Sequence, residues 1–409
     1  MSFKGVKINK QNGGLGRRNA STDAVMALVV GMPTTGTTVE LNKAYKLLQV
    51  SDAEDLGVNA SFDANNGLLA HNEVNDFFTY CPDGTLFLIP TTAGLEASAL
   101  LQEAALKATI RSEKDIKSIG VIGATSTVST LINEVETVQA VVNAFALENN
   151  YIDAVILEGK ASDAALTISN YPDLRAEKAP NVSVSIAQDL AVASLDAAYA
   201  KNASVGAVLG MLAVRQVNEN LGSVDILNKP DGSKGNEDYP LTVLGTDRFA
   251  AAALSDGTPF DNLTPPEVKE LTSKGYIFAG AFNGYGGIFF NGSPTCVEKA
   301  SDYAYIENNR VWNKAARLIR TTLIPKVKGI VKKDPTTGFI KATTISAWQG
   351  LLNKAMETMV IDNEISGFDF YINPQQTLTE DSPLKIQGNI VIDSIVFEFE
   401  FDLGLTDKL

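Results

Sequence analysis

Histidine and cysteine are scarce in this chain. His71 is the only histidine among 409 residues, which excludes most hydrolytic triads and most metal sites built on imidazole. Cys81 and Cys296 are the only cysteines. They form neither a disulfide framework nor a CxxC metal motif, and so few cysteines fit a reducing compartment. The acidic residues lack the spacing of a calcium loop. We therefore expect a protein that is not an enzyme and holds no cofactor or metal.

Excess positive charge and long hydrophobic runs are missing as well. The formal net charge is −14, which argues against general nucleic-acid binding because that function needs a basic surface. No apolar run approaches the roughly 18 residues of a membrane span, and the polar opening Met1-Ser2-Phe3-Lys4 does not resemble a signal peptide. We expect a chain that contacts neither nucleic acid nor membrane. Its length and its 45% hydrophobic content allow two or three domains.

Strand and helix patterns alternate through the first 300 residues. Apolar runs predict buried strands at residues 24–31, 85–89, 119–123, 154–158 and 182–186. Amphipathic or small-residue patterns predict helices at residues 73–80, 95–110, 127–149, 203–216 and 264–273. Residues 276–290 predict a hairpin around a glycine-rich turn. This order predicts an α/β domain with a mostly parallel sheet and flanking helices.

The pattern changes near residue 300. Two amphipathic helices, at residues 311–324 and 344–358, are followed by strands at residues 368–372 and 390–403. This is α+β order. We therefore divide the chain into an N-terminal arm at residues 1–22, an α/β domain at residues 23–299 and an α+β domain at residues 300–409.

The last strand has the cleanest alternation in the sequence. One side carries Ile395, Phe397, Phe399, Phe401 and Leu403, and the other carries Val396, Glu398, Glu400 and Asp402. As an edge strand of its own domain, it would use these charges to deter aggregation. As an exchanged strand, it would add to the sheet of a neighbouring subunit. Both interpretations stay open on the residues alone.

The first residues form a second candidate arm. Val6, Lys7 and Ile8 lie in a short strand-like run, and Gly13, Gly14 and Gly16 then supply flexible chain. A free tail is the simpler interpretation. The alternative is that this run joins the same sheet as the last strand.

Three glycine-rich loops invite a comparison with phosphate-binding motifs. Residues 31–38 have the glycine spacing of a P-loop but carry Thr37 where the motif needs lysine. Residues 122–127 connect a strand to a helix without the GxGxxG spacing. Residues 284–288 precede strand-like sequence, which favours a hairpin turn. We expect ordinary turns at all three places, and a nucleotide- or small-molecule-binding enzyme stays the alternative.

A local excess of positive charge interrupts this acidic chain. Between residues 308 and 341, Asp334 is the only acidic residue that opposes nine basic ones, Arg310, Lys314, Arg317, Arg320, Lys326, Lys328, Lys332, Lys333 and Lys341. A solvated helix face is one explanation of this basic island. The other is a docking surface for an acidic partner.

The order of these segments resembles the sheath proteins of contractile phage tails and related injection systems. The resemblance covers nearly the whole chain. It is carried by residues 22–31, by Asn75-Asp76-Phe77-Phe78, and by residues 204–210, 271–287 and 305–310, together with the two later helices and the last strand.

The resemblance implies a non-enzymatic subunit that forms hexameric rings with itself, stacked helically around an inner tube protein. Baseplate and tail terminator proteins would be further partners. It implies assembly in the bacterial cytoplasm and a place in the contractile tail of a virion or injection particle. Residues 23–299 would form the outer domain and residues 300–409 the inner one.

Roles for individual residues follow from the same resemblance. Val6, Lys7, Ile8 and the apolar face from Ile395 to Leu403 would form strands between subunits. Gly13, Gly14 and Gly16 would act as the hinge of the arm during contraction. The candidates for contact with the tube are Arg310, Lys314, Arg317, Lys326, Lys328, Lys332 and Lys333. A different virion structural protein, such as a tube or baseplate component, is a further alternative.

Overall fold

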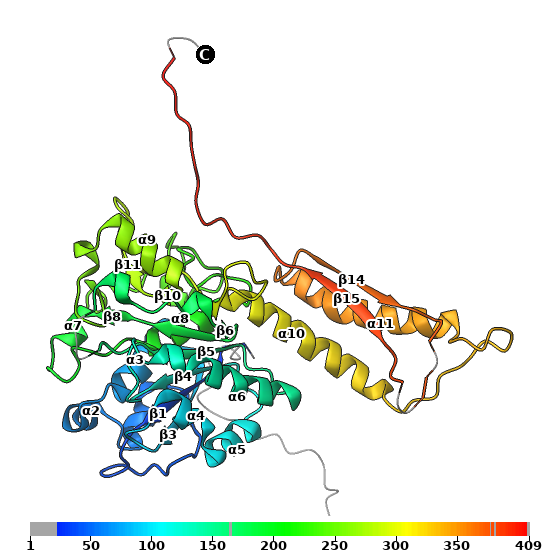
Figure 1. Ribbon diagram of the computed structural model, residues 1–409, viewed down its shortest axis with the longest axis horizontal. Coiled ribbons are helices and arrows are strands. Elements are labelled where there is room, and N and C mark those ends of the chain that lie inside the picture. The colour runs from blue at the N-terminus through cyan, green and yellow to red at the C-terminus, as the bar shows by residue number, and fades with distance from the viewer. Residues whose placement is uncertain (1–22, 163–165, 377, 380–381, 407–409) are drawn as a thin grey trace, which may run out of the picture.

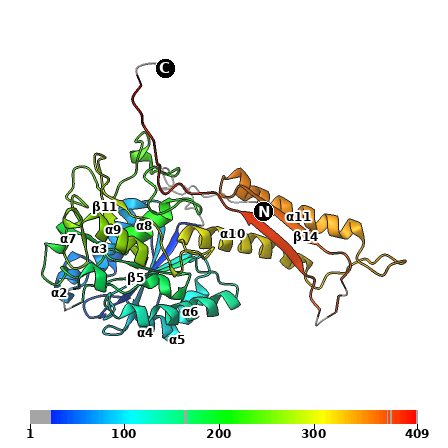
Figure 2. The same ribbon diagram turned by 45° about the horizontal axis from the view of Figure 1, so that its top comes forward.

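The computed structural model describes residues 23–162, 166–376, 378–379 and 382–406. An α/β body carries an elongated extension, which begins with helix α10 (Ile306–Leu323) and continues through α11 (Ala342–Ile361) (Figures 1 and 2). The C-terminal segment leaves the base of this extension and runs away from both parts (Figure 1). Within the described residues, no helix combines the length and the apolar character needed to cross a membrane.

The body is built on a seven-stranded sheet with the order β10-β7-β5-β4-β1-β3-β2. Neighbouring strands are parallel except for β2 and β3, which are antiparallel. The predicted parallel sheet is therefore confirmed. Its strands are β1 (Val25–Gly31), β2 (Tyr45–Leu47), β3 (Thr85–Thr91), β4 (Ser118–Ile122), β5 (Ala154–Glu158), β7 (Val182–Ser185) and β10 (Tyr276–Ile277).

Two helical layers cover the two faces of this sheet. Met26 and Leu28 of β1 face one core together with α1, α2, α3 and α8, whereas Ala27 and Val29 face the other with α4, α5, α6 and α9. Burial on both faces explains why the central strands are continuous apolar runs. These helices are α1 (Val50–Asp55), α2 (Ala60–Asn66), α3 (Ala70–Tyr80), α4 (Ala97–Gln102), α5 (Ala104–Ser112), α6 (Val135–Leu147), α8 (Gly206–Val214) and α9 (Pro265–Lys274).

Two predicted helices differ from the structure. The helix predicted at residues 95–110 is divided into α4 and α5 at Glu103, whose ψ of 124° lies outside the helical range. The carboxylate of Glu103 accepts a hydrogen bond from Asn42 Nδ2 at 2.7 Å, and this contact holds the break. The helix predicted at residues 127–149 is shorter, because a 3-10 turn at Leu131–Asn133 precedes α6.

Short strands complete the body. The predicted hairpin is confirmed between β11 (Ala279–Gly280) and β12 (Phe289–Phe290), while β10 instead joins the edge of the main sheet. The remaining short elements are β6 (Lys178–Ala179), β8 (Ala187–Asp189), α7 (Leu190–Ala193), β9 (Ala252–Leu254) and β13 (Cys296–Val297).

The extension pairs two helices with two strands. Strand β14 (Gly367–Ile372) is antiparallel to β15 (Ile386–Val391), and both pack against α10 and α11 around a small core that contains Val311, Leu352 and Met356. The strand predicted at residues 390–403 is therefore wrong for the single chain. Beyond Val391, residues 392–406 form no regular element, because no described strand lies beside them to complete a ladder.

Helices α3 and α8 approach closely because α8 carries glycine at the contact. A β-carbon at position 206 would overlap the carbonyl oxygen of Glu73, and one at position 210 would lie 2.8 Å from the carbonyl oxygen of Phe77. The backbone of α3 cannot retreat without disturbing the sheet beneath it. The glycines in this predicted small-residue helix thus have a packing role.

We predict that Gly206→Ala lowers the free energy of unfolding by about 1–3 kcal/mol, the usual cost of overpacking. The matched control is Gly350→Ala in α11, where an added β-carbon meets nothing within 4 Å. This exposed helical site should gain about 0.5–1 kcal/mol. Urea titration of both variants measures the change in the free energy of unfolding, which should be negative for Gly206→Ala and positive for Gly350→Ala. Equal changes would contradict the packing of α8 on α3.

Candidate functional site

The first half of α10 lies inside the body. The Arg310 guanidinium is 1% exposed and donates to the carbonyl oxygens of Gln216, at 3.1 Å, and Arg215, at 3.2 Å. Asn313 Nδ2 donates to Asp153 Oδ1 at 2.9 Å. A buried charge needs such partners to remain in the interior. These bonds fix the direction in which the extension leaves the body.

The next two cations of α10 also pair within the chain. Lys314 Nζ lies 2.7 Å from Asp23 Oδ2 and also bonds Glu364, while Arg317 Nη1 lies 3.1 Å from Asp153 Oδ1. We expected Arg310, Lys314 and Arg317 to face a tube. The structure corrects this for Arg310, which is buried, and it places the other two in half-buried ion pairs at the root of the extension.

Most of the remaining basic island lies at the far tip. The chain between α10 and α11 exposes five lysines, Lys326, Lys328, Lys332, Lys333 and Lys341. Apolar side chains lie between them, and Val327 and Ile330 are exposed as well. The basic charges of this loop were predicted to form a docking surface, but the apolar residues between them, which are visible in the sequence, were not part of that prediction. We call residues 324–341 the tip loop.

The hairpin of the extension leaves both of its outer edges unpaired within the described residues. Its inward face is completed by Phe370, which lies over the opposite Gly388. A β-carbon at position 388 would come within 2.7 Å of the Phe370 ring. Both outer edges therefore present main-chain groups that another strand can pair with.

The point where the C-terminal segment leaves the hairpin is fixed by Asp393. Its carboxylate accepts a hydrogen bond from Asn218 Nδ2 at 2.9 Å and another from the Ser366 hydroxyl. Asn218 also donates to the carbonyl oxygen of Asn363 at 2.8 Å. Sequence analysis missed this anchor. Its one local signal is a carboxylate directly after the apolar run at residues 390–392.

We call residues 392–406 the C-terminal segment. After Asp393 this segment exposes large apolar side chains. Phe399 is 88% exposed, Phe401 81% and Leu403 83%, whereas Ile395 is half-buried. Phe397 contacts the ring of Tyr305, with centroids 5.2 Å apart. Burying each such side chain is worth about 1.5–3 kcal/mol. The segment thus offers a strip of apolar surface that association would stabilise.

Val6, Lys7, Ile8 and the three glycines Gly13, Gly14 and Gly16 lie outside the described residues. The described chain begins with Asp23, beside the root of α10. The roles of these residues remain predictions.

The glycine loops pack as turns. Strands β1 and β4 end side by side at the point where the strand order reverses, the usual ligand position in such sheets. There, a β-carbon at Gly31 would lie 2.7 Å from the carbonyl oxygen of Gly123. The backbone at Gly31 therefore packs directly against the backbone at Gly123, which leaves no space for a ligand between them. The loop at residues 284–288 closes the β11–β12 hairpin, as expected.

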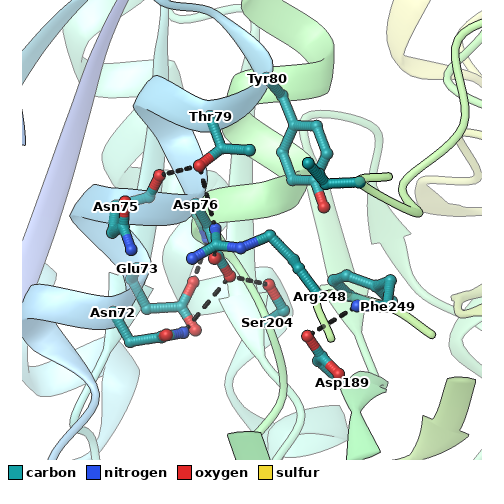
Figure 3. A network of polar contacts seen from close by, with 12 residues as sticks. Asn72, Glu73, Asn75, Asp76, Thr79, Tyr80, Asp189, Ser204, Arg248 and Phe249 are labelled. Carbon is teal, nitrogen blue, oxygen red and sulfur yellow. Dashed lines mark hydrogen bonds and ion pairs between the residues drawn. The ribbon is translucent and has the colours of Figure 1, made fainter. Parts of the chain in front are cut away.

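A buried polar network lies beneath α3 and has the appearance of an acid cluster (Figure 3). Asp76 pairs with Arg248, and Ser204 Oγ donates to Asp76 at 3.3 Å. Glu73 accepts from the backbone amides at the start of α8, including Val205 N at 2.9 Å. Asp189 accepts from Phe249 N at 2.9 Å. The carboxylates thus tie loops and helix ends together.

The cavity beside this network measures about 10 Å³, which holds at most about one water molecule. A substrate does not fit there. The only histidine, His71, lies elsewhere, with Nε2 3.1 Å from Glu54 Oε1. The contacts of the network connect α3 to the start of α8 and to the loop that carries Arg248 and Phe249.

The fold of this chain is similar to that of a chain in a solved prophage baseplate. A chain in the cryo-EM structure of the anti-feeding prophage baseplate matches with a TM-score of 0.58 and 14% identity, over 99% of each chain. A sheath tail protein from Desulfitobacterium hafniense matches with 11% identity over 96% of this chain and 100% of that one, but its TM-score of 0.48 is too low to indicate a shared fold. The first likeness confirms, at the level of fold, the resemblance to phage-tail proteins.

The chain belongs to the DUF2586 family. Residues 3–293 match its N-terminal domain and residues 302–409 its C-terminal domain. Among curated protein sequences, none matches significantly.

The buried network makes stability depend on pH. Burial raises the pKa of Asp76 to about 6, although Arg248 opposes the shift, and burial together with the charge of Asp76 raises the pKa of Glu73 well above its ordinary value. The native state therefore holds protons that the unfolded chain releases near pH 4. Stability from these groups is complete below that pH and is lost as pH rises through the raised values.

We predict that the free energy of unfolding falls as pH rises from 5 to 8, and that Glu73→Gln makes this slope shallower by removing one of the buried titrating groups. Urea titrations at several pH values measure the slope. Glu357→Gln, at an exposed position of α11, is the matched control and should leave the slope unchanged. A Glu73→Gln slope identical to that of the wild type would contradict the raised pKa.

Proposed function

We propose that this chain is the structural subunit of a contractile tail sheath. In this proposal it polymerises as stacked hexameric rings around an inner tube and contracts to drive that tube through a target envelope. Residues 23–299 form the outer domain, residues 300–409 the inner one, and residues 1–22 an arm. The observation that carries the proposal is the C-terminal segment, whose apolar strip pairs with no strand within the described residues.

Strand exchange follows from the state of the hairpin. The edges of β14 and β15 are unpaired within the described residues, and the C-terminal segment continues directly from β15 past Asp393. A segment with period-two alternation that pairs with no strand among the described residues is suited to pair with a sheet edge of another copy. Rings of identical subunits supply that edge at a fixed position. The fold likeness to a prophage baseplate chain is consistent with this setting.

We predict that deletion of residues 395–409 abolishes tubular polymers in negative-stain electron microscopy. The same deletion should change the stability of the monomer by less than about 0.5 kcal/mol, the usual range for surface changes, because most of the removed apolar side chains are exposed in the single chain. Urea titration of the monomer measures this second quantity.

Polymer formation and monomer stability together distinguish exchange between copies from folding within one chain. Lost polymers with an unchanged monomer support exchange between copies. Normal long tubes from the truncated chain would contradict the proposal. A destabilised monomer would show that the segment instead belongs to its own fold.

The tip loop is the proposed contact with the tube. It lies at the end of the extension farthest from the body (Figure 1), and it combines five exposed lysines with exposed Val327 and Ile330. Such a mixture suits an acidic partner with apolar patches. Arg310, Lys314 and Arg317 are left out of this contact because their charges are used at the root of α10.

We predict that reversing Lys326, Lys328, Lys332 and Lys333 to Glu weakens attachment to the inner tube by about tenfold or more, since four favourable charge contacts of about 0.2–1 kcal/mol each become repulsive. Co-sedimentation with purified tube measures attachment. Self-assembly without tube should be unchanged.

The control reverses the same number of exposed lysines on the body, at Lys46, Lys114, Lys269 and Lys299, and should leave tube attachment near that of the wild type. An equal loss in both variants would indicate a general effect of net charge. That result would contradict the role of the tip loop.

A further inference from the structure

Asparagine followed directly by glycine is a site of spontaneous chemical change in proteins. Asparagine is among the thermolabile residues, and glycine has no β-carbon to hinder attack by its own backbone nitrogen. Within the described residues, three such pairs occur, Asn66-Gly67, Asn283-Gly284 and Asn291-Gly292. A fourth, Asn12-Gly13, lies outside them. The reacting residues of the three pairs are identical, so the fold decides which pair reacts first.

The reaction needs a free glycine nitrogen and a free asparagine amide. The nitrogen loses its proton and bonds to Cγ of the asparagine, while the Cγ–Nδ2 bond breaks and ammonia leaves with that proton. Water then opens the five-membered succinimide at either carbonyl, which gives aspartate or isoaspartate. The sequence consumes water, needs no oxidant or reductant, and adds one negative charge. Groups held in hydrogen bonds react only after a local opening.

The pair Asn66-Gly67 is protected at the end of α2. Asn66 Nδ2 donates to the carbonyl oxygen of Phe62 at 2.8 Å, and the Gly67 N–H donates to the carbonyl oxygen of Asp63. The nitrogen that would attack is therefore already bonded. This pair has to open before it can react.

The side chain of Asn291 is held at both of its polar atoms. Oδ1 accepts from Phe278 N at 2.9 Å, and Nδ2 donates to the carbonyl oxygen of Tyr276 at 3.0 Å. Both bonds tie the asparagine to β10 and the residue that follows it. The amide must leave them before its nitrogen can be lost.

Asn283 and Gly284 instead form an exposed turn in the β11–β12 hairpin. Tyr285 N donates to the carbonyl oxygen of Phe282 at 3.0 Å, and Gly284 has a φ of 79°, which is the geometry of a type II turn. Neither the Asn283 amide nor the Gly284 N–H bonds another described residue. A β-carbon at Gly284 would meet nothing within 4 Å. Both reacting groups are thus free and unpacked.

We propose that Asn283 is a modification site, which deamidates spontaneously in the native protein while Asn66 and Asn291 are protected by the fold. The inference does not depend on the proposed sheath function. The product places a new carboxylate two residues before Tyr285, whose hydroxyl donates to Asp238 Oδ2 at 3.1 Å. Isoaspartate also lengthens the main chain by one methylene group, so the bond that closes the turn is lost.

Peptide mapping by mass spectrometry tests this selectivity. In folded protein kept at mildly alkaline pH, the peptide with Asn283 should convert first. The peptides with Asn66 and Asn291 should convert at least about tenfold more slowly, because they react only from locally opened states. In urea that unfolds the chain, all three should convert at similar rates. The conversion at Asn283 should accelerate as pH rises, since the glycine nitrogen must lose its proton.

A pair of variants links the change in charge to this residue. Asn283→Gln should remove the first acidic species that ion-exchange chromatography detects on storage, because glutamine would have to close a slower six-membered ring. The matched control is Asn66→Gln, at an exposed position, which should leave that species unchanged.

Three results would overturn the proposal. Equal conversion of the three peptides in folded protein would show that the fold does not protect Asn66 and Asn291. A preference for Asn283 that persists in urea would assign the selectivity to local sequence. An acidic species that survives in Asn283→Gln would place the first reaction elsewhere.

Discussion

Every element after residue 305 depends on how α10 is held in the body. The buried Arg310 requires the carbonyl oxygens of Arg215 and Gln216, because a guanidinium without such partners is too costly to bury. Lys314 and Arg317 extend this network to Asp23 and Asp153. One continuous helix therefore transmits the orientation of the body to the tip loop, the hairpin and the C-terminal segment.

The extension exposes unpaired strand edges and apolar side chains. Within the described residues the hairpin has two unpaired edges. The C-terminal segment exposes aromatic rings whose contact with water is unfavourable. A long apolar strand with free edges normally leads to aggregation. Here Glu398, Glu400 and Asp402 alternate with the rings, and charges at such positions deter aggregation.

Sequence predicted the body well for a physical reason. Strands of a parallel sheet that is covered on both faces are continuous apolar runs, and β1, β3, β4 and β5 could be located on that basis. The break at Glu103 lies where its carboxylate bonds the distant Asn42, a contact that no local sequence pattern shows. Arg310 was predicted to lie on a surface because a count of basic residues carries no information on which of them are buried. The spacing of positions 310, 314 and 317 puts them on one helical face, and that spacing was the available signal for a shared inward role. For the final strand, the alternating pattern indicated a tendency to form a β-strand but did not identify the strand it pairs with.

Amide hydrogen exchange of residues 392–406 tests the central claim most directly, because protection requires main-chain hydrogen bonds. The account predicts fast exchange in the monomer, where these residues form no ladder, and strong protection at alternate amides around Phe397, Phe399 and Phe401 in the assembled polymer. Protection already complete in the monomer, or exchange that stays fast in the polymer, would contradict it.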